Sequence, residues 1–168
     1  MMNIWVAPIL SFTSEEVYGH INGKKLDSVF LEEWPKQVII ISDKEKDIGD
    51  ILFSLKQLAA KKLDEARNKE VIGSSLDATI YLTVDKKIYR LLEEYKDELK
   101  FIFITSHCIL QEINSDGKTE IIIEKNEHSK CERCWHRNET VGSVKDHPGL
   151  CSRCHENVYL NGEKRKLG

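Results

Sequence analysis

Four cysteines near the end of the chain constrain its fold more than any other feature. They form two Cys-x2-Cys pairs, Cys131 with Cys134 and Cys151 with Cys154, with sixteen residues between the pairs. Two such pairs at this spacing are typical of a zinc site. Zn²⁺ takes four tetrahedral ligands, at about 2.3 Å when they are thiolate sulfurs, and four cysteines leave no position for water. The pattern therefore predicts one structural zinc ion.

Other uses of these cysteines fit the sequence less well. Disulfides suit secreted proteins, but the chain opens without an apolar signal peptide, and a fifth cysteine, Cys108, would be left over. A thioredoxin-like redox site uses one Cys-x2-Cys pair beside a βαβ unit. A Cys3His site stays open as an alternative, because three histidines lie close to the pairs: His136, His147 and His155. Reduced thiols with zinc indicate a cytoplasmic protein.

Charge is distributed unevenly along the chain. The net charge is −3 overall, but residues 1–127 carry −6 and residues 128–168 carry +3. A positive zinc module ending in the run 164–166 (Lys-Arg-Lys) suits contact with a phosphate backbone. Cations beside the cysteines have a second use, because four thiolates around Zn²⁺ leave an excess of two negative charges. The residues able to offset it are Lys130, Arg133, Arg137 and Arg153.

Residues 42–127 have the pattern of a small α+β domain. Ser42 and Glu45 match a capping box, and apolar residues at helical spacing then predict a long helix over about 44–69. Alternation predicts a strand over 78–84, and Asp85 is expected to cap a second helix. The segment contains no glycine-rich phosphate loop and no nucleophile elbow. The domain therefore offers no recognisable catalytic site.

The second half of this domain is predicted to be mainly β. Residues 101–113 are β-rich, residues 114–117 form a turn, and residues 119–125 form another strand. His107 and Cys108 are neighbours on a strand, so their side chains point to opposite faces. We therefore expect Cys108 to lie in the core and not in a catalytic Cys–His pair.

The first 41 residues indicate helical pieces with much apolar surface. Pro8 interrupts an apolar stretch, and Thr13 with Glu16 matches a capping box for a helix running to Ile21. Residues 22–41 are interpreted as a connection, with a short extended run over 29–31 and a helix break at Trp34-Pro35. We expect an incomplete helical domain whose other helices lie upstream. The alternative is that this end packs on the middle domain.

Several motifs resemble the C-terminal region of bacterial isoleucyl-tRNA synthetases, which are class I aminoacyl-tRNA synthetases. Residues 7–16 and 28–35 resemble the end of the anticodon-binding helical bundle. The more specific motifs are Glu-Ala-Arg-Asn-Lys at 65–69, Val-Ile-Gly-Ser-Ser-Leu at 71–76, Cys-Glu-Arg-Cys-Trp-His at 131–136 and His-Pro-Gly-Leu-Cys-Ser-Arg-Cys at 147–154. The resemblance implies an α+β chain in three parts: 1–41, the incomplete anticodon-binding domain; 42–127, the small α+β domain; and 128–168, a zinc-ribbon-like module.

The resemblance also implies a function and its limits. The full-length enzyme ligates isoleucine to its tRNA with ATP, but this chain has neither the HIGH nor the KMSKS motif and no editing domain. It is therefore expected to be inactive alone, without catalytic residues, and to need the missing upstream synthetase domains for ATP binding. Its expected partner is isoleucine-accepting tRNA, contacted at the anticodon end. The candidate contact residues are Arg133, Trp135, His136, Arg137 and Arg153, since arginines bind phosphates and aromatic rings stack on bases. For Trp135 the alternative is shielding of the zinc thiolates.

The sequence leaves two other functional classes to compare. The zinc module also resembles that of formamidopyrimidine-type DNA glycosylases, but those enzymes use an N-terminal proline nucleophile, and this chain opens Met-Met-Asn. The other alternative is a stand-alone zinc-ribbon adaptor that binds protein or another nucleic acid.

Overall fold

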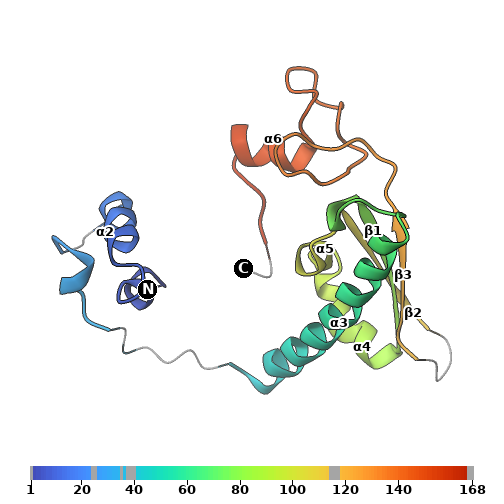
Figure 1. Cartoon of the computed structure of the whole chain (residues 1–168), viewed down its shortest axis with the longest axis horizontal. Helices are drawn as coiled ribbons and strands as arrows, with labels where there is room; N and C mark the ends of the chain where they lie inside the picture. Colours follow the sequence, from blue (N-terminus) through green and yellow to red (C-terminus); the bar gives the residue numbers. More distant parts are fainter. Residues whose placement is uncertain (1, 24–25, 35, 37–40, 114–117, 166–168) are drawn as a thin grey trace. The chain divides into compact units, whose positions relative to one another are not determined.

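The computed structural model describes residues 2–23, 26–34, 36, 41–113 and 118–165. It separates into two compact units, Met1–Ile41 and Ser42–Gly168 (Figure 1). Helices, a three-stranded sheet and a four-cysteine cluster confirm the predicted α+β class. Pro35, the predicted turn at 114–117 and Lys166 lie outside the described residues. None of the described helices combines the length and the apolar character needed to cross a membrane.

The first unit consists of α1 (Met2–Val6), α2 (Ser11–His20) and the 3₁₀ helix η1 (Val29–Leu31). The predicted cap at Thr13 is wrong, because backbone hydrogen bonds from Leu10 N–H to Val6 and from Ser14 N–H to Leu10 begin the helix earlier. The expected extended run over 29–31 is also wrong. Ser28 caps a 3₁₀ turn there by accepting from the Phe30 N–H at 3.2 Å.

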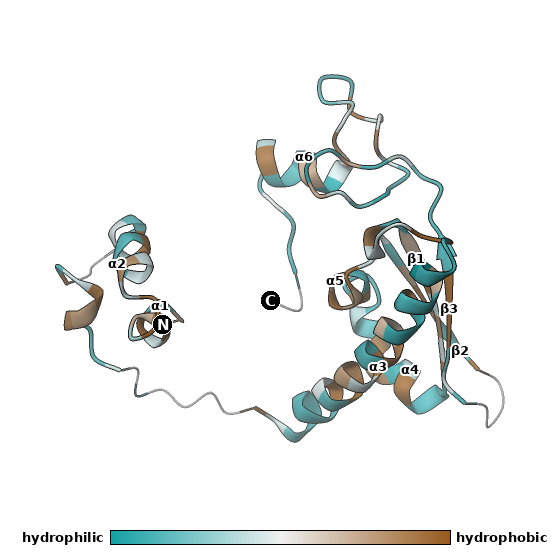
Figure 2. Cartoon of the chain, viewed as in Figure 1, coloured by the Kyte–Doolittle hydropathy of each residue, from teal (hydrophilic) through white to brown (hydrophobic). Residues whose placement is uncertain are grey.

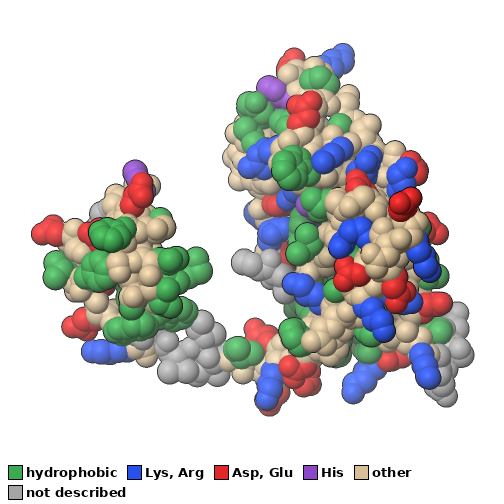
Figure 3. Space-filling view, in the orientation of Figure 1, with side chains coloured by type: hydrophobic (Ala, Val, Ile, Leu, Met, Phe, Trp, Pro, Cys, Tyr) green, Lys and Arg blue, Asp and Glu red, His purple; other side chains and the backbone are tan. Residues whose placement is uncertain are grey.

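Large apolar side chains remain on the surface of this unit. Ile9 and Phe12 are 81% and 93% exposed, and Trp5 is 43% exposed. The buried residues of the unit are few, and the apolar ones among them are Ala7, Tyr18 and Val29. The space-filling view accordingly shows green side chains gathered over it (Figure 3). The expectation that further helices upstream cover this apolar surface stays a prediction.

The second unit begins with the long helix α3 (Asp43–Asn68), whose capping box is confirmed. The Ser42 hydroxyl accepts from the Glu45 N–H at 3.3 Å, and the Glu45 carboxylate accepts from the Ser42 N–H at 2.8 Å. The buried stripe consists of Ile48, Leu55, Ala59, Leu63 and Ala66. Figure 2 shows the resulting division of α3 into hydrophobic and hydrophilic faces. This stripe forms one wall of the main core.

The sheet has the order β2-β1-β3, from β1 (Ala78–Val84), β2 (His107–Glu112) and β3 (Glu120–Lys125). β2 pairs parallel with β1, and β3 pairs antiparallel on the other side, so that Ile80 stands opposite both Cys108 and Ile123. Alternate residues of β1 are fully buried in the main core: Ala78, Ile80, Leu82 and Val84. Cys108 lies in the same core, as expected.

The segment between β1 and β2 is a helical crossover, made of α4 (Lys86–Leu92), the 3₁₀ helix η3 (Glu93–Tyr95) and α5 (Leu99–Phe103). Asp85 caps α4, as predicted, by accepting from two backbone N–H groups at 2.8 and 3.0 Å. The prediction that β structure begins at Phe101 is wrong. Parallel strands need a crossover connection, and Phe101 belongs to its last helix, which ends at the left-handed Ile104 (φ 58°).

Candidate metal centre

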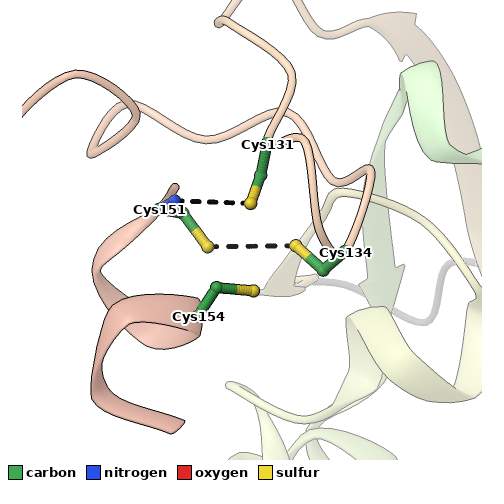
Figure 4. Close-up of side chains that lie close together, drawn as sticks. All are labelled: Cys131, Cys134, Cys151 and Cys154. Carbon is green, nitrogen blue, oxygen red and sulfur yellow. Dashed lines mark hydrogen bonds between the residues drawn. The ribbon is translucent and has the colours of Figure 1, made fainter. Parts of the chain in front are cut away.

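The four cysteines of the two pairs converge on one point. Their ligand atoms all lie within 4.8 Å of one another, and all but the half-buried Cys134 are buried. Figure 4 shows the sulfurs facing a common centre, with Cys134 Sγ 3.8 Å from Cys151 Sγ. Four sulfurs about 2.3 Å from a tetrahedral zinc ion stand about 3.8 Å apart. All five cysteines are free thiols, so the geometry fits a metal ion.

Backbone hydrogen bonds shape the first pair. The Cys131 N–H donates to the His136 carbonyl at 2.9 Å, and the Trp135 N–H donates back to the Cys131 carbonyl at 2.9 Å. This tight loop places Trp135 in the left-handed region, with φ 65°. An isolated antiparallel bridge between Lys130 and Arg137 closes the loop.

A short helix presents the second pair. Cys151 is the residue before α6 (Ser152–Tyr159), and Cys154 lies in the first turn of α6. The Cys151 N–H donates to Cys131 Sγ at 3.4 Å, and the Glu132 N–H donates to the Gly149 carbonyl at 3.0 Å. The two pairs are therefore joined by direct hydrogen bonds as well as by their shared centre.

The three neighbouring histidines have other contacts. His136 Nδ1 lies 3.1 Å from the Cys134 carbonyl oxygen, and its ring meets Phe101 edge-on at 5.8 Å between centroids. His147 stacks on Tyr159 at 4.0 Å, and His155 also contacts this pair. Among the described residues, the metal-ligating cluster contains cysteines alone.

Electrostatics act in opposite directions on the thiols of this centre. Burial opposes ionisation of Cys131, but backbone N–H groups of Cys134, Cys151 and Arg133 outweigh it and lower the pKa of Cys131 to about 6. Arg133 Nη1 also donates to Cys154 Sγ at 3.7 Å. Burial raises the pKa of Cys151 to about 12, so a metal ion must displace its proton on binding.

Of the five predicted RNA contacts, Arg133 and Trp135 are exposed, whereas the other three are half-buried against other parts of the chain. Arg137 donates from Nε to Asp77 Oδ1 at 2.8 Å, and Arg153 forms an ion pair with Glu163 at 3.1 Å. His136 is half-buried against Phe101. Trp135 is different, because 59% of it is exposed, with Lys130 Nζ 5.1 Å above its ring.

Sequence reasoning missed the residues on which the zinc module rests. Asp77 and Ser106 accept hydrogen bonds from Arg137, and Phe101 contacts three side chains of the module and the chain that follows it. No local pattern marks these three residues, and Phe101 fell in a segment predicted to be β. A signal for them exists only in three dimensions.

Two family models match the chain. Residues 2–82 match the anticodon-binding domain of tRNA ligases, and residues 129–157 match a zinc finger found in FPG and IleRS. The second match covers all four cysteines. Together with the cluster geometry it indicates a zinc-binding site.

Curated tRNA ligases are similar to nearly the whole chain. The isoleucine–tRNA ligases of Alcanivorax borkumensis and Shewanella amazonensis are 39% and 35% identical over 96% of this chain, and that of Ruthia magnifica is 38% identical over 97%. The chain spans only 18% of the length of each of these relatives. It therefore corresponds to the C-terminal anticodon-binding and zinc-finger region of isoleucine–tRNA ligases.

Proposed function

We propose that this chain binds the anticodon end of isoleucine-accepting tRNA, as the tail of a cytoplasmic isoleucine–tRNA ligase. The observation that carries the proposal is the joining, in one chain, of an anticodon-binding match over 2–82 to a four-cysteine zinc-finger match over 129–157. Isoleucine, ATP and the ligation step belong to the full-length parent. The proposed parts are 1–41, 42–127 and 128–168.

A single structural zinc ion would be held by Cys131, Cys134, Cys151 and Cys154. The donor set fits it, because four sulfurs within 4.8 Å of one another suit tetrahedral coordination and leave no position for a reacting water. When bound, zinc links the two pairs and favours the deprotonated, thiolate form of the cysteines. Arg133 then offsets part of the negative charge through its contact with Cys154.

Trp135 is the proposed point of base contact. Its ring is 59% exposed, its backbone is fixed in the left-handed region, and Lys130 lies over one face. Unpaired anticodon-loop bases stack on such rings, and a neighbouring cation can meet a phosphate. We rank the other four candidates below Trp135 as RNA contacts, because each already has a partner within the chain. They are Arg133, His136, Arg137 and Arg153.

The test is equilibrium binding of the zinc-loaded chain to isoleucine tRNA and to an unrelated tRNA, over a series of salt concentrations. We expect preferential binding that weakens with salt, because phosphate contacts release counterions, and that is lost on chelation. Trp135→Ala should weaken binding by roughly 5- to 150-fold, the effect of about 1–3 kcal/mol of stacking, whereas Trp135→Phe keeps a ring and should lose less. Equal affinity for both tRNAs, or none for either, would overturn the proposal.

A further inference from the structure

The zinc module contacts the sheet part of its own unit through two separate clusters. The first, the polar anchor, consists of Asp77, Ser106 and Arg137. Asp77 Oδ1 accepts from Arg137 Nε at 2.8 Å, and the Ser106 hydroxyl accepts from the Arg137 backbone N–H at 2.6 Å. The other end of the guanidinium donates to the His128 carbonyl at 3.1 Å. Arg137 is therefore held by both its backbone and its side chain.

The second cluster, the aromatic anchor, is centred on Phe101 of α5. Its ring meets the His136 imidazole edge-on, with 5.8 Å between centroids and 68° between planes. The guanidinium carbons of Arg153 and Arg165 lie 5.0 and 3.8 Å from the ring centroid. One side chain of α5 thus touches the loop that follows the first cysteine pair, α6 and the chain that follows α6.

Glu163 connects the cations of the aromatic anchor. Its carboxylate accepts from Arg153 at 3.1 Å and lies 3.4 Å from Arg165, while the Glu163 N–H donates to the Asn157 side chain at 2.8 Å. The two arginines are therefore held near Phe101 by a shared counter-charge, and the segment after α6 is tied back to α6 itself.

Both anchors act on the residues next to Trp135. His136 belongs to the aromatic anchor and Arg137 to the polar anchor, and the two follow Trp135 directly in the chain. The backbone of Trp135 is left-handed, and its N–H is held by the Cys131 carbonyl. The chain on its other side is the His136–Arg137 segment. The direction of the Trp135 ring therefore depends on how that segment is held.

We infer that Phe101 is a positioning residue that fixes the zinc module on the sheet part and thereby sets the direction in which Trp135 meets RNA. This inference rests on the proposed function for its RNA readout. Phe101 is well placed for such a role, because it is half-buried and stands apart from the main core of the described residues, which includes its neighbours Leu99, Ile102 and Phe103. Removing its ring loosens the contact between the two parts and leaves each part folded.

The experiment uses the full zinc-loaded chain with Phe101→Ala, with Phe101→Tyr as the conservative variant. Phe53→Ala is the matched control, since Phe53 is an exposed phenylalanine of α3 in the same unit. Residual dipolar couplings report whether the zinc module and the sheet share one orientation. We expect a single alignment in wild type, Phe101→Tyr and Phe53→Ala. In Phe101→Ala, where the polar anchor alone remains, we expect the couplings of the zinc module to be reduced relative to those of the sheet, with zinc content unchanged in all four proteins.

The RNA arm measures affinity for isoleucine tRNA. Phe101→Ala should weaken binding about 2- to 12-fold, the effect of ordering one more side chain on binding. Because Phe101 acts through Trp135, its substitution should have little further effect in a Trp135→Ala background. A purely structural defect would instead add to the Trp135→Ala loss.

Several outcomes would overturn the inference. A single shared alignment in Phe101→Ala, an equal effect of Phe53→Ala, or loss of zinc from Phe101→Ala each contradicts a positioning role. If wild type binds no tRNA, the proposed function fails, while the dipolar couplings still decide whether Phe101 fixes the module. If Phe101→Ala fails to fold, Arg165→Gln probes the same anchor without altering α5. Unchanged dipolar couplings in Arg165→Gln would then reject the inference.

Discussion

The sheet part and the zinc module of the second unit are stabilised in different ways. Among the described residues, the main core of the sheet part contains fifteen buried residues, from α3, the segment that follows it, the crossover and all three strands. The buried cluster of the zinc module contains three, all of them cysteines. In the part of the module that the structure describes, the partly buried apolar residues against that cluster are Val141, Leu150 and Cys134. A module this small cannot bury enough apolar surface by itself, so metal binding has to supply its folding free energy.

The largest expected effect is on the zinc module alone. Cys154→Ser, or removal of zinc by a chelator, should unfold residues 128–165 and leave the sheet part folded, because apparent zinc-binding free energies of zinc-finger peptides are about 10–16 kcal/mol. Amide hydrogen exchange resolves the two parts. Cys108→Ser is the control, since this cysteine lies in the sheet core and should not change zinc content. Surviving protection around Cys131 in Cys154→Ser would show that the module has a core of its own.

A large effect confined to the sheet part should come from Leu82→Ala. Leu82 is fully buried at the centre of β1, opposite Leu110 and Ile121. Removing three carbons there should cost about 2–5 kcal/mol in urea unfolding, with zinc still bound. Leu58→Ala, the same change at a half-exposed site on α3, should cost less than about 1 kcal/mol. Loss of zinc from Leu82→Ala would contradict the independence of the two parts.

A smaller effect should come from the contact that joins them. The hydrogen bond from Arg137 holds the pKa of Asp77 below its ordinary value of 3.8. A depressed pKa contributes stability that is fully present above pH 3.8 and is lost as the pH falls through the folded value. Asp77→Asn should therefore lower Tm at neutral pH and converge with wild type below pH 3.8.

Differential scanning calorimetry at several pH values measures how the two Tm values converge. Asp64→Asn is its control, because it breaks an exposed ion pair with Arg67 and should have little effect on Tm. If the difference between Asp77→Asn and wild type stayed constant with pH, the carboxylate would not be the stabilising group.

The smallest effect is expected at the start of α3. Ser42→Ala removes one half of the capping box and should cost about 1 kcal/mol, read from urea unfolding of the sheet part. Ser42→Asn retains a capping oxygen and should recover most of the loss. Equal losses in both variants would mean that the hydroxyl is not acting as a cap. Zinc affinity should be the same in all three proteins.

Features encoded in neighbouring residues could be predicted from the sequence. Three of these features depend on residues a few positions apart: the cap at Ser42, the strand over 78–84 and the cap at Asp85. The fourth, the cysteine cluster, depends on a spacing that is typical of zinc sites. The resemblance to isoleucyl-tRNA synthetases likewise rested on short motifs and is confirmed.

Features that depend on distant pairing could not be predicted. The parallel pairing of β2 with β1 forces a helical crossover, and this makes Phe101 helical although its neighbours favour a strand. The inward direction of Arg137 depends on Asp77, sixty residues earlier. Only a fold can show which of the five proposed RNA contacts are exposed, and these are Arg133 and Trp135.

The position of β1 in the middle of the sheet also determines when the sheet can be completed during synthesis of the chain. Both partners of β1 follow it in the chain, and the pairing with β3 is complete only at Lys125, 41 residues after Val84. At roughly 5–20 residues per second of synthesis, one edge of the central strand stays without its partner for about 2–8 s. Pairing over such separations is intrinsically slow and exposes strands to aggregation. A nascent chain of this protein therefore carries an unprotected strand edge until its last strand has been made.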